Sequence, residues 1–420
     1  MGFTKDLWMR PVEQPDGKVE RVKNARWGKG KRWLSVWHDE AGQERSRAFG
    51  KKDLADKHWQ AMETDRERGD YLDPKAGREL LASVGKRWLA SRVNDPSTQI
   101  RYESWWRLHV EPTFGRRRVK AIRPSEIQAW LAELGEKFGS STAAGAYLVL
   151  QGCLELAVAD QMIKANPARA SVVSKPRAGD GGKVKPWTED LVGMVIDAHP
   201  DSLRLMPVLM AGCGIRINEG IGLALEDFDF DEKTLHVRRQ VKKLGTGHVY
   251  ALPKSDLERE IPLPEWVAAA ARVHIAKYPP RPCTLPWEKL TGKPQTHSIL
   301  FRWSDGGHVR YRTYSEQTWK PAIAKAGIIP EPGTDNRGRR RYVTTRKEGP
   351  HQLRHYYASV MLADGVSVKE LAEFLGHHDA AFTLRVYTNS QELHQTGEKP
   401  QVARSARCLA VFPGVCAKVA

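Results

Sequence analysis

The stretch from His351 to Tyr387 constrains the fold and chemistry of this chain more than any other. It begins H-Q-L-R-H, continues with apolar residues at helical spacing, and is preceded by Pro350. This pattern predicts a helix that begins at His351, with Arg354 on the same face of its first turn. A helix start offers unpaired N–H groups and the positive end of the helix dipole. With an arginine fork and an imidazole added, it is suited to bind one phosphodiester.

The second half of this stretch reads L-G-H-H-D and then A-F-T-L-R-V-Y. Gly365 is expected to end the first helix, and Gly376 a second one over residues 366–375, so that His377 lies at a turn. Tyr387 is expected on a short third helix. Two histidines, an arginine and a tyrosine on three short helices predict a phosphate-handling site.

Two plainer interpretations compete with this one. A tyrosine on a short amphipathic helix is most often half-buried packing. His351 and His355 have the i, i+4 spacing of zinc ligands, but the glutamate of the H-E-x-x-H motif is missing and Arg354 lies between them.

Two upstream motifs agree with the phosphate interpretation. G-C-G-I-R-I-N-E runs from Gly212 to Glu219, and P-K-S-D-L-E-R-E-I-P-L runs from Pro253 to Leu263. Together with H-Q-L-R-H, L-G-H and the final tyrosine, their order and spacing resemble the tyrosine recombinases, also called phage integrases. Each motif is weak by itself, because an arginine paired to a glutamate is often structural and a hairpin lysine is usually only solvated.

The resemblance implies a set of site residues, a nucleophile and a reaction. The catalytic set is Arg216, Lys254, His351, Arg354, His377 and the nucleophile Tyr387, with Glu219 orienting Arg216 or His351. It implies DNA strand cleavage and rejoining through a 3′-phosphotyrosyl intermediate, with neither a metal nor a cofactor. Cys213 and Gly220 depart from the residues common in the family, and neither is one of the proposed catalytic residues.

Composition agrees with a nucleic-acid partner. The 420 residues carry a formal net charge of +17, which favours a polyanion. No run of about 18 apolar residues is evident, and the N-terminus lacks the apolar core of a signal peptide, so no membrane segment is expected. The cysteines show no C-x-x-C pair and are expected to be reduced thiols in a cytosol.

The expected fold class is multidomain α+β, mainly helical with small sheets. Residues 1–70 are expected to form a small sheet plus helix, which either binds arm-type DNA sites or is only a solvated basic sheet. Residues 76–173 are expected to form a helical core-binding bundle. Residues 183–395 are expected to form the mixed α/β catalytic domain, and residues 396–420 a tail. Within the bundle, Ser125 is expected to cap a helix, E-P-T-F-G at 111–115 to end another, and Leu148 to be buried.

The expected partners are double-stranded DNA attachment sites, on which the chain forms a homotetramer, with a DNA-bending accessory protein or an excisionase. The expected location is the bacterial cytoplasm, associated with the nucleoid, where the protein integrates a phage or mobile element into the chromosome. Two other classes remain open: a type IB topoisomerase-like enzyme, and a DNA-binding regulator that has lost its chemistry.

Overall fold

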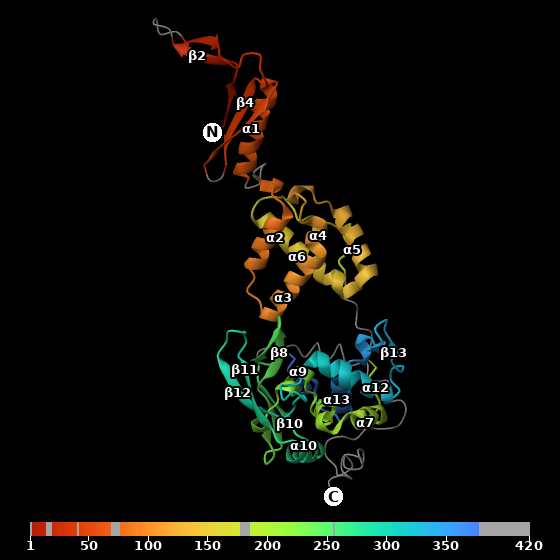
Figure 1. The fold of residues 1–420 in the computed structure, drawn as a ribbon. Coiled ribbons are helices and arrows are strands. Elements are labelled where there is room, and N and C mark those ends of the chain that lie inside the picture. Colours follow the sequence, from red (N-terminus) through yellow and green to blue (C-terminus); the bar gives the residue numbers. More distant parts are fainter. Residues whose placement is uncertain are drawn as a thin grey trace. The chain divides into compact units, whose positions relative to one another are not determined.

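The computed structural model describes residues 2–13, 19–39, 42–68, 76–176, 185–254 and 257–377. The chain, drawn in Figure 1, forms two compact units, residues 1–179 and 180–420. Each unit has its own hydrophobic core. Within the described ranges more residues lie in helices than in the strands of the small sheets, as expected for the α+β class.

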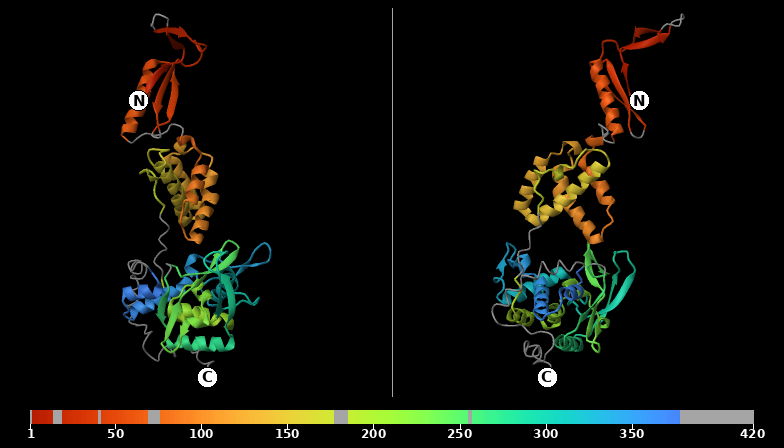
Figure 2. Two further views of the ribbon diagram at one scale, coloured as in Figure 1. Left: turned by 90° about the vertical axis from the view of Figure 1, so that its left-hand side faces the viewer. Right: turned by 180° about the vertical axis from the view of Figure 1, so that it is seen from behind.

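The first unit begins with a three-stranded antiparallel sheet in the order β1-β4-β5, and helix α1 packs on it (Figure 2). The elements are β1 (Phe3–Asp6), β4 (Trp33–His38), β5 (Glu44–Phe49) and α1 (Lys52–Glu67). A small sheet with one helix was predicted for this region, from strand-like alternation of apolar residues and from helical composition. The short polar strand β1 carries no such pattern and was missed, as was the hairpin β2 (Met9–Glu13)–β3 (Val19–Lys23).

A helical bundle completes the described part of the first unit. Its helices are α2 (Leu81–Ala90), α3 (Pro96–Trp105), the π-helical turn η2 (Trp106–Val110), α4 (Glu111–Phe114), α5 (Pro124–Phe138) and α6 (Ser140–Ala159). Its core buries both aliphatic and aromatic side chains, among them Leu81, Trp106, Phe114, Ile127 and Leu150. Burying each such side chain contributes about 1.5–3 kcal/mol.

Three details of the predicted bundle are wrong. The helix ends within E-P-T-F-G but not before it: a π turn precedes Pro112, and the chain stays helical to Phe114. Proline has no N–H and crowds the preceding turn, which a wider turn accommodates. Ser125 is not the cap, because α5 begins at Pro124 and the Glu126 carboxylate accepts the Arg123 N–H at 3.1 Å. Leu148 is 45% exposed.

Helix α6 also departs from an expectation. By length and hydropathy alone it could cross a membrane, with a mean hydropathy of 1.4 over 18 residues. Half of that window is buried within the protein, and its apolar face forms the centre of the bundle core. A helix that is apolar on most faces is also what the core of a bundle requires.

The second unit surrounds helix α8 (Leu205–Cys213), all of whose residues are buried. Helices α7 (Glu189–Ala198) and α13 (His351–Ala363) pack against it, and α9 (Ile217–Gly222) follows at a sharp corner. The further helices and helical turns are α10 (Glu265–Lys277), α11 (Tyr311–Tyr314), η7 (Ser315–Trp319), α12 (Lys320–Lys325) and α14 (Val368–Leu375).

The sheets of this unit are small and antiparallel. One has the order β10-β7-β6, and three hairpins pair β8 with β9, β11 with β12, and β13 with β14. Their bounds are β6 (Phe228–Asp229), β7 (Thr234–Val237), β8 (Gln240–Leu244), β9 (Gly247–Ala251), β10 (Arg259–Pro262), β11 (Arg281–Pro286), β12 (Pro294–Ile299), β13 (Gly333–Thr334) and β14 (Arg340–Arg341). The strands of the Lys254 region therefore belong to two different sheets, since β9 pairs with β8 and β10 with β7.

Short 3-10 turns join several of these elements. They are Ala76–Arg78, Val119–Ala121, Pro167–Arg169, Asp201–Leu203, Leu225–Asp227 and Arg346–Glu348.

Candidate active site

The corner between α8 and α9 places Arg216. Gly214 ends α8 in the left-handed conformation, with φ +62°, and Arg216 then stands at the N-cap of α9. Glycine suits this corner for two reasons. It adopts a positive φ without strain, and a Cβ at this position would lie 2.3 Å from the ring of Tyr357. Arg216 therefore stands at the start of a new helix, directly after a tight turn.

Glu219 is the buried centre of the cluster, with none of its side chain exposed. Its Oε1 accepts from Nη1 of Arg216 at 2.8 Å and from Nη1 of Arg259 at 3.1 Å. Its Oε2 accepts from the Arg216 backbone N–H at 2.8 Å and from Nη2 of Arg259 at 2.6 Å. Burial alone would raise the pKa of Glu219, but Arg259, Arg216 and Arg354 hold it at about 2. Glu219 is therefore ionised at neutral pH.

Arg354 joins the corner to the C-terminal end of α14. Its side chain is buried on α13, and Nη1 donates to the Gly214 carbonyl at 2.6 Å. Nη2 donates to the Leu375 carbonyl and, at 3.1 Å, to Nε2 of His377. One guanidinium thus binds residues from two motifs that lie over 150 positions apart in the chain.

His377 follows the left-handed residue Gly376, whose φ is +60°. The Gly376 carbonyl accepts from Nη2 of Arg216 at 3.3 Å, so both arginines bind this turn. Desolvation and the charges of Arg354, Arg216, Arg259 and Lys254 lower the pKa of His377 to about 3. Because its Nε2 accepts from Arg354, the neutral ring carries its proton on Nδ1.

His351 opens α13 at the edge of the same cluster. The ring keeps an exposed surface, but desolvation on its inner side and then the charges of Arg354, His355 and Arg216 lower its pKa to about 4. The direction, toward a neutral imidazole at pH 7, suits a group that accepts a proton. His355 lies one turn along, with ring centroids 6.1 Å apart, and its pKa is also lowered to about 4, first by desolvation.

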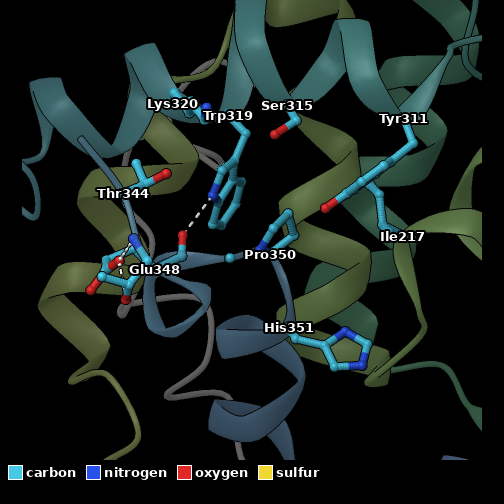
Figure 3. A pocket seen from close by; sticks show the side chains of 11 residues that line it. Ile217, Tyr311, Ser315, Trp319, Lys320, Thr344, Glu348, Pro350 and His351 are labelled. Carbon is cyan, nitrogen blue, oxygen red and sulfur yellow. Dashed lines mark hydrogen bonds between the residues drawn. The ribbon is translucent and has the colours of Figure 1, made fainter. Parts of the chain in front are cut away.

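A cavity of about 640 Å³ adjoins His351 (Figure 3). Ile217, Tyr311, Ser315 and Trp319 line it from α9 and from the α11–η7 segment. The indole Nε1 of Trp319 donates to the Glu348 carbonyl at 2.8 Å, which attaches this wall to the turn before α13. His351 is therefore accessible from an open hollow in the same unit.

Two predicted residues remain, Lys254 and Tyr387. Lys254 is exposed and follows β9, near enough for its charge to act on His377. The expected hairpin around it is wrong in one respect, because the strands on either side of Lys254 are not paired with each other. Tyr387 lies outside the described residues. Among those residues, no group of three or more His, Cys, Asp or Glu side chains could hold a metal ion.

Arg259 is the site residue that the sequence reasoning missed. Besides Glu219, it binds the Phe374 carbonyl through Nε at 2.8 Å, and only 7% of its side chain is exposed. It is the first residue of the R-E-I-P-L strand, which follows Lys254 in the family pattern. The available signal was an arginine on the same face of a strand as the apolar residues Ile261 and Leu263. No local pattern indicates which groups this arginine binds.

Two family comparisons match the regions that hold these elements. Residues 189–394 match the sequence model of the phage integrase family, and residues 81–135 match that of the phage integrase N-terminal SAM-like domain. The chain belongs to the phage integrase family of tyrosine recombinases. The predicted family resemblance is thereby confirmed.

Other integrases resemble the chain along most of its length. A putative prophage phiRv2 integrase of Mycobacterium tuberculosis is 26% identical over 342 residues, which cover 78% of this chain and 81% of that protein. A tyrosine recombinase XerC-like protein of Caldanaerobacter subterraneus is 22% identical over 337 residues, covering 74% and 79%.

Solved integrase structures share the fold. The Tn1549 transposon integrase in complex with a circular intermediate DNA has a TM-score of 0.59 at 21% identity, covering 76% of this chain and 99% of that one. A lambda integrase tetramer bound to a Holliday junction has a TM-score of 0.54 at 15% identity, covering 85% and 93%. At these identities the likeness is one of fold.

Proposed function

We propose that this phage integrase family member is a site-specific recombinase in which Tyr387 attacks a DNA phosphodiester. The attack forms a bond between the phenolic oxygen and phosphorus and releases the 5′ oxygen of the cleaved strand. The observation that carries the proposal is that Arg216 and Arg354 meet at the turn that carries His377, with Arg216 bound to the buried carboxylate of Glu219. These three residues come from separate motifs of the family pattern.

The chemistry follows from the charge that attack on phosphorus creates. The transition state carries more negative charge on the non-bridging oxygens, and arginine forks stabilise such charge in a partly dry site. In this proposal Arg216 and Arg354 bind those oxygens, and His377 adds a hydrogen bond from Nδ1. The chain needs no nucleotide, because the phosphotyrosyl link keeps the energy of the phosphodiester until a 5′-hydroxyl attacks it.

Two proton transfers accompany these bonds. An ordinary tyrosine has a pKa of about 10, so Tyr387 must lose its proton as it attacks. His351, neutral at pH 7, is the proposed acceptor of that proton. Lys254 is the proposed donor to the leaving 5′ oxygen, and Glu219 orients Arg216.

The proposed partners follow from the relatives. The lambda integrase neighbour is a tetramer on a Holliday junction, and the Tn1549 neighbour is bound to a circular intermediate DNA. We extend this to a homotetramer of the present chain on double-stranded attachment sites, acting on nucleoid DNA in a bacterial cytoplasm with a bending protein or an excisionase. Residues 1–70, 76–173 and 183–395 are the proposed arm-binding, core-binding and catalytic domains.

The deciding experiment uses a suicide substrate, nicked close to the cleavage site so that the released fragment diffuses away. The protein should form a covalent adduct on denaturing gels, also in excess chelator. Tyr387→Phe should bind the same DNA and form none, because only the phenolic oxygen can make the link.

Four results would oppose the proposal in different ways. An adduct formed by Tyr387→Phe would move the nucleophile to another tyrosine. Cleavage that stops in chelator and returns with zinc would support a metal site at His351 and His355. Adduct formation with no strand exchange between two DNA partners would favour a topoisomerase-like enzyme. The absence of any adduct would favour an inactive DNA-binding regulator.

A further inference from the structure

Arg216 and Arg259 occupy the hydrogen-bond acceptor positions of the Glu219 carboxylate. Each of its oxygens accepts two hydrogen bonds, one from Arg216 and one from Arg259. A carboxylate offers about four acceptor positions, so both arginines are needed to occupy them. Because Glu219 is wholly buried, bulk water cannot take the place of a missing arginine.

Arg259 also contacts the turn that carries His377. Its Nε donates to the Phe374 carbonyl at 2.8 Å. Its side chain runs beside Gly376, where an added Cβ would lie 3.2 Å from Cδ and 3.3 Å from Nη1 of Arg259. The Gly376 carbonyl is in turn an acceptor for Arg216. Arg259 therefore contacts both Glu219, which binds Arg216, and the L-G-H turn, which carries His377.

We propose that Arg259 is a positioning residue of this recombinase: by binding both oxygens of Glu219 and the Phe374 carbonyl, it holds Arg216 and His377 in the orientation that meets the scissile phosphate. This inference rests on the proposed function, because strand cleavage is its readout. Arg259 acts through these neighbours and is not placed in contact with DNA.

The physical reason lies in what Glu219 does without Arg259. Its two oxygens would keep only the hydrogen bonds from Arg216, which draws that guanidinium toward the carboxylate and away from the Gly376 carbonyl. The charged and titratable groups that face Glu219 are Arg216 on α9, Arg354 and His351 on α13, and Arg259 on β10. Burial raises the pKa of Glu219 and Arg259 is the strongest opposing influence, so the pKa rises when Arg259 is removed.

The test compares Arg259→Gln with Arg259→Lys in single-turnover cleavage of the suicide substrate from pH 5 to pH 8. Arg259→Gln should cut the rate roughly 10- to 100-fold, the usual range for outer partners of a site. The rate should fall further as the pH is lowered, because Glu219 then takes up a proton. The wild-type protein should lack this acid-side fall, and Arg259→Lys should recover part of the rate.

A double variant tests the route of the effect. On a Glu219→Gln background the further change Arg259→Gln should cost less than about threefold, since the two side chains act as one unit. Full additivity of the two losses would overturn the inference. So would a folded Arg259→Gln protein with the wild-type rate and pH profile.

Arg239→Gln is the matched control. Arg239 is equally buried, with 5% of its side chain exposed. It pairs with Asp227 at 2.7 Å and donates to the Gly222 carbonyl, at the opposite end of α9 from Arg216. Its loss should lower the melting temperature without adding an acid-side fall in rate, and the same fall in this control would reduce Arg259 to a stabilising residue.

If Arg259→Gln is unfolded at the assay temperature, Arg259→Lys and the double variant decide by the same criteria. If the wild-type protein itself forms no adduct, the proposed function fails instead.

Discussion

Gly214 determines how closely helix α13 approaches the α8–α9 corner. Its left-handed backbone ends α8, its missing Cβ leaves room for Tyr357, and its carbonyl accepts from Arg354. Three requirements thus meet in one residue, and two of them arise only when α13 is packed in place.

Gly214→Ala should therefore destabilise the protein more than the backbone alone explains. A left-handed alanine costs about 1–2 kcal/mol, and the 2.3 Å approach to Tyr357 adds a clash that the packed core cannot absorb. Gly327→Ala is the control, because Gly327 has φ +72° and no atom within 4 Å of an added Cβ. Urea unfolding should give a loss for Gly214→Ala at least about 1 kcal/mol larger than for Gly327→Ala. Equal losses would mean that the corner moves freely to accept the methyl group.

At the scale of elements, two π turns share one cause. η2 ends at Val110 and η7 at Trp319, and in each case a proline, Pro112 or Pro321, follows two residues later inside the next helix. A proline cannot donate to the preceding turn and crowds it, and a widened turn removes that conflict while the helix continues. A proline is more often a stop signal, which explains why the predicted helix boundary at Glu111 was wrong.

Helix α7 is attached to α11 by a titratable pair. The Nδ1–H of His199 donates to the Val195 carbonyl at 2.6 Å, and Nε2 accepts from the Tyr314 hydroxyl at 2.9 Å. Both side chains are buried, and desolvation lowers the pKa of His199 to about 4. This arrangement requires the neutral ring, since a protonated His199 could not accept from Tyr314.

Acid should therefore weaken this contact. His199 binds a proton more tightly in the unfolded chain, with a pKa near 6.5, than in the folded one. Its contribution is complete above about pH 6.5 and is lost as the pH falls toward 4. Between pH 7 and pH 5 the free energy of unfolding should fall by about 2 kcal/mol more in the wild-type protein than in His199→Gln, which does not titrate. Urea unfolding at the two pH values measures this difference, and parallel pH dependence in the two proteins would contradict it.

At the scale of the whole molecule, the net charge of +17 is shared among parts with separate cores. The three-stranded sheet with helix α1 has a small buried core of its own, including Val36, Trp37 and Ala55. Whether this part reads arm-type DNA sites or is only a basic scaffold stays a prediction. Salt dependence can separate the two, because each phosphate contact releases counterions.

A chain that starts at Ala76 should still form the covalent adduct on core-site DNA. It should no longer bind DNA through arm sites, and efficient integration should fail with that binding. On arm-site DNA, the logarithm of affinity against the logarithm of salt concentration should be steeper for the full-length protein, by about 0.9 for each phosphate that residues 1–70 bind. Core-site DNA without arm sites is the control, on which the two slopes should agree. Equal slopes and equal integration on arm-site DNA would leave residues 1–70 without a DNA role.

Local sequence was sufficient to predict the elements whose cause is local. Helix α13 and the ends of α13 and α14 follow from apolar spacing after Pro350 and from Gly365 and Gly376, which adopt positive φ; all of these act within a few residues. The motif spacing also identified Arg216, Glu219, Arg354 and His377, which the structure brings together, although their catalytic roles and that of Tyr387 stay predictions.

How these elements meet depends on the tertiary structure. Arg259 binds Glu219, 40 positions away, and the Phe374 carbonyl, 115 positions away, and Lys254 lies between strands of two different sheets. No local pattern predicts such contacts, because a strand arginine has the same neighbours in sequence whether it faces water or a buried carboxylate. Its role arises when strand β10 packs beside α14. Arg259 then reaches Glu219, whose buried charge must be satisfied by arginines.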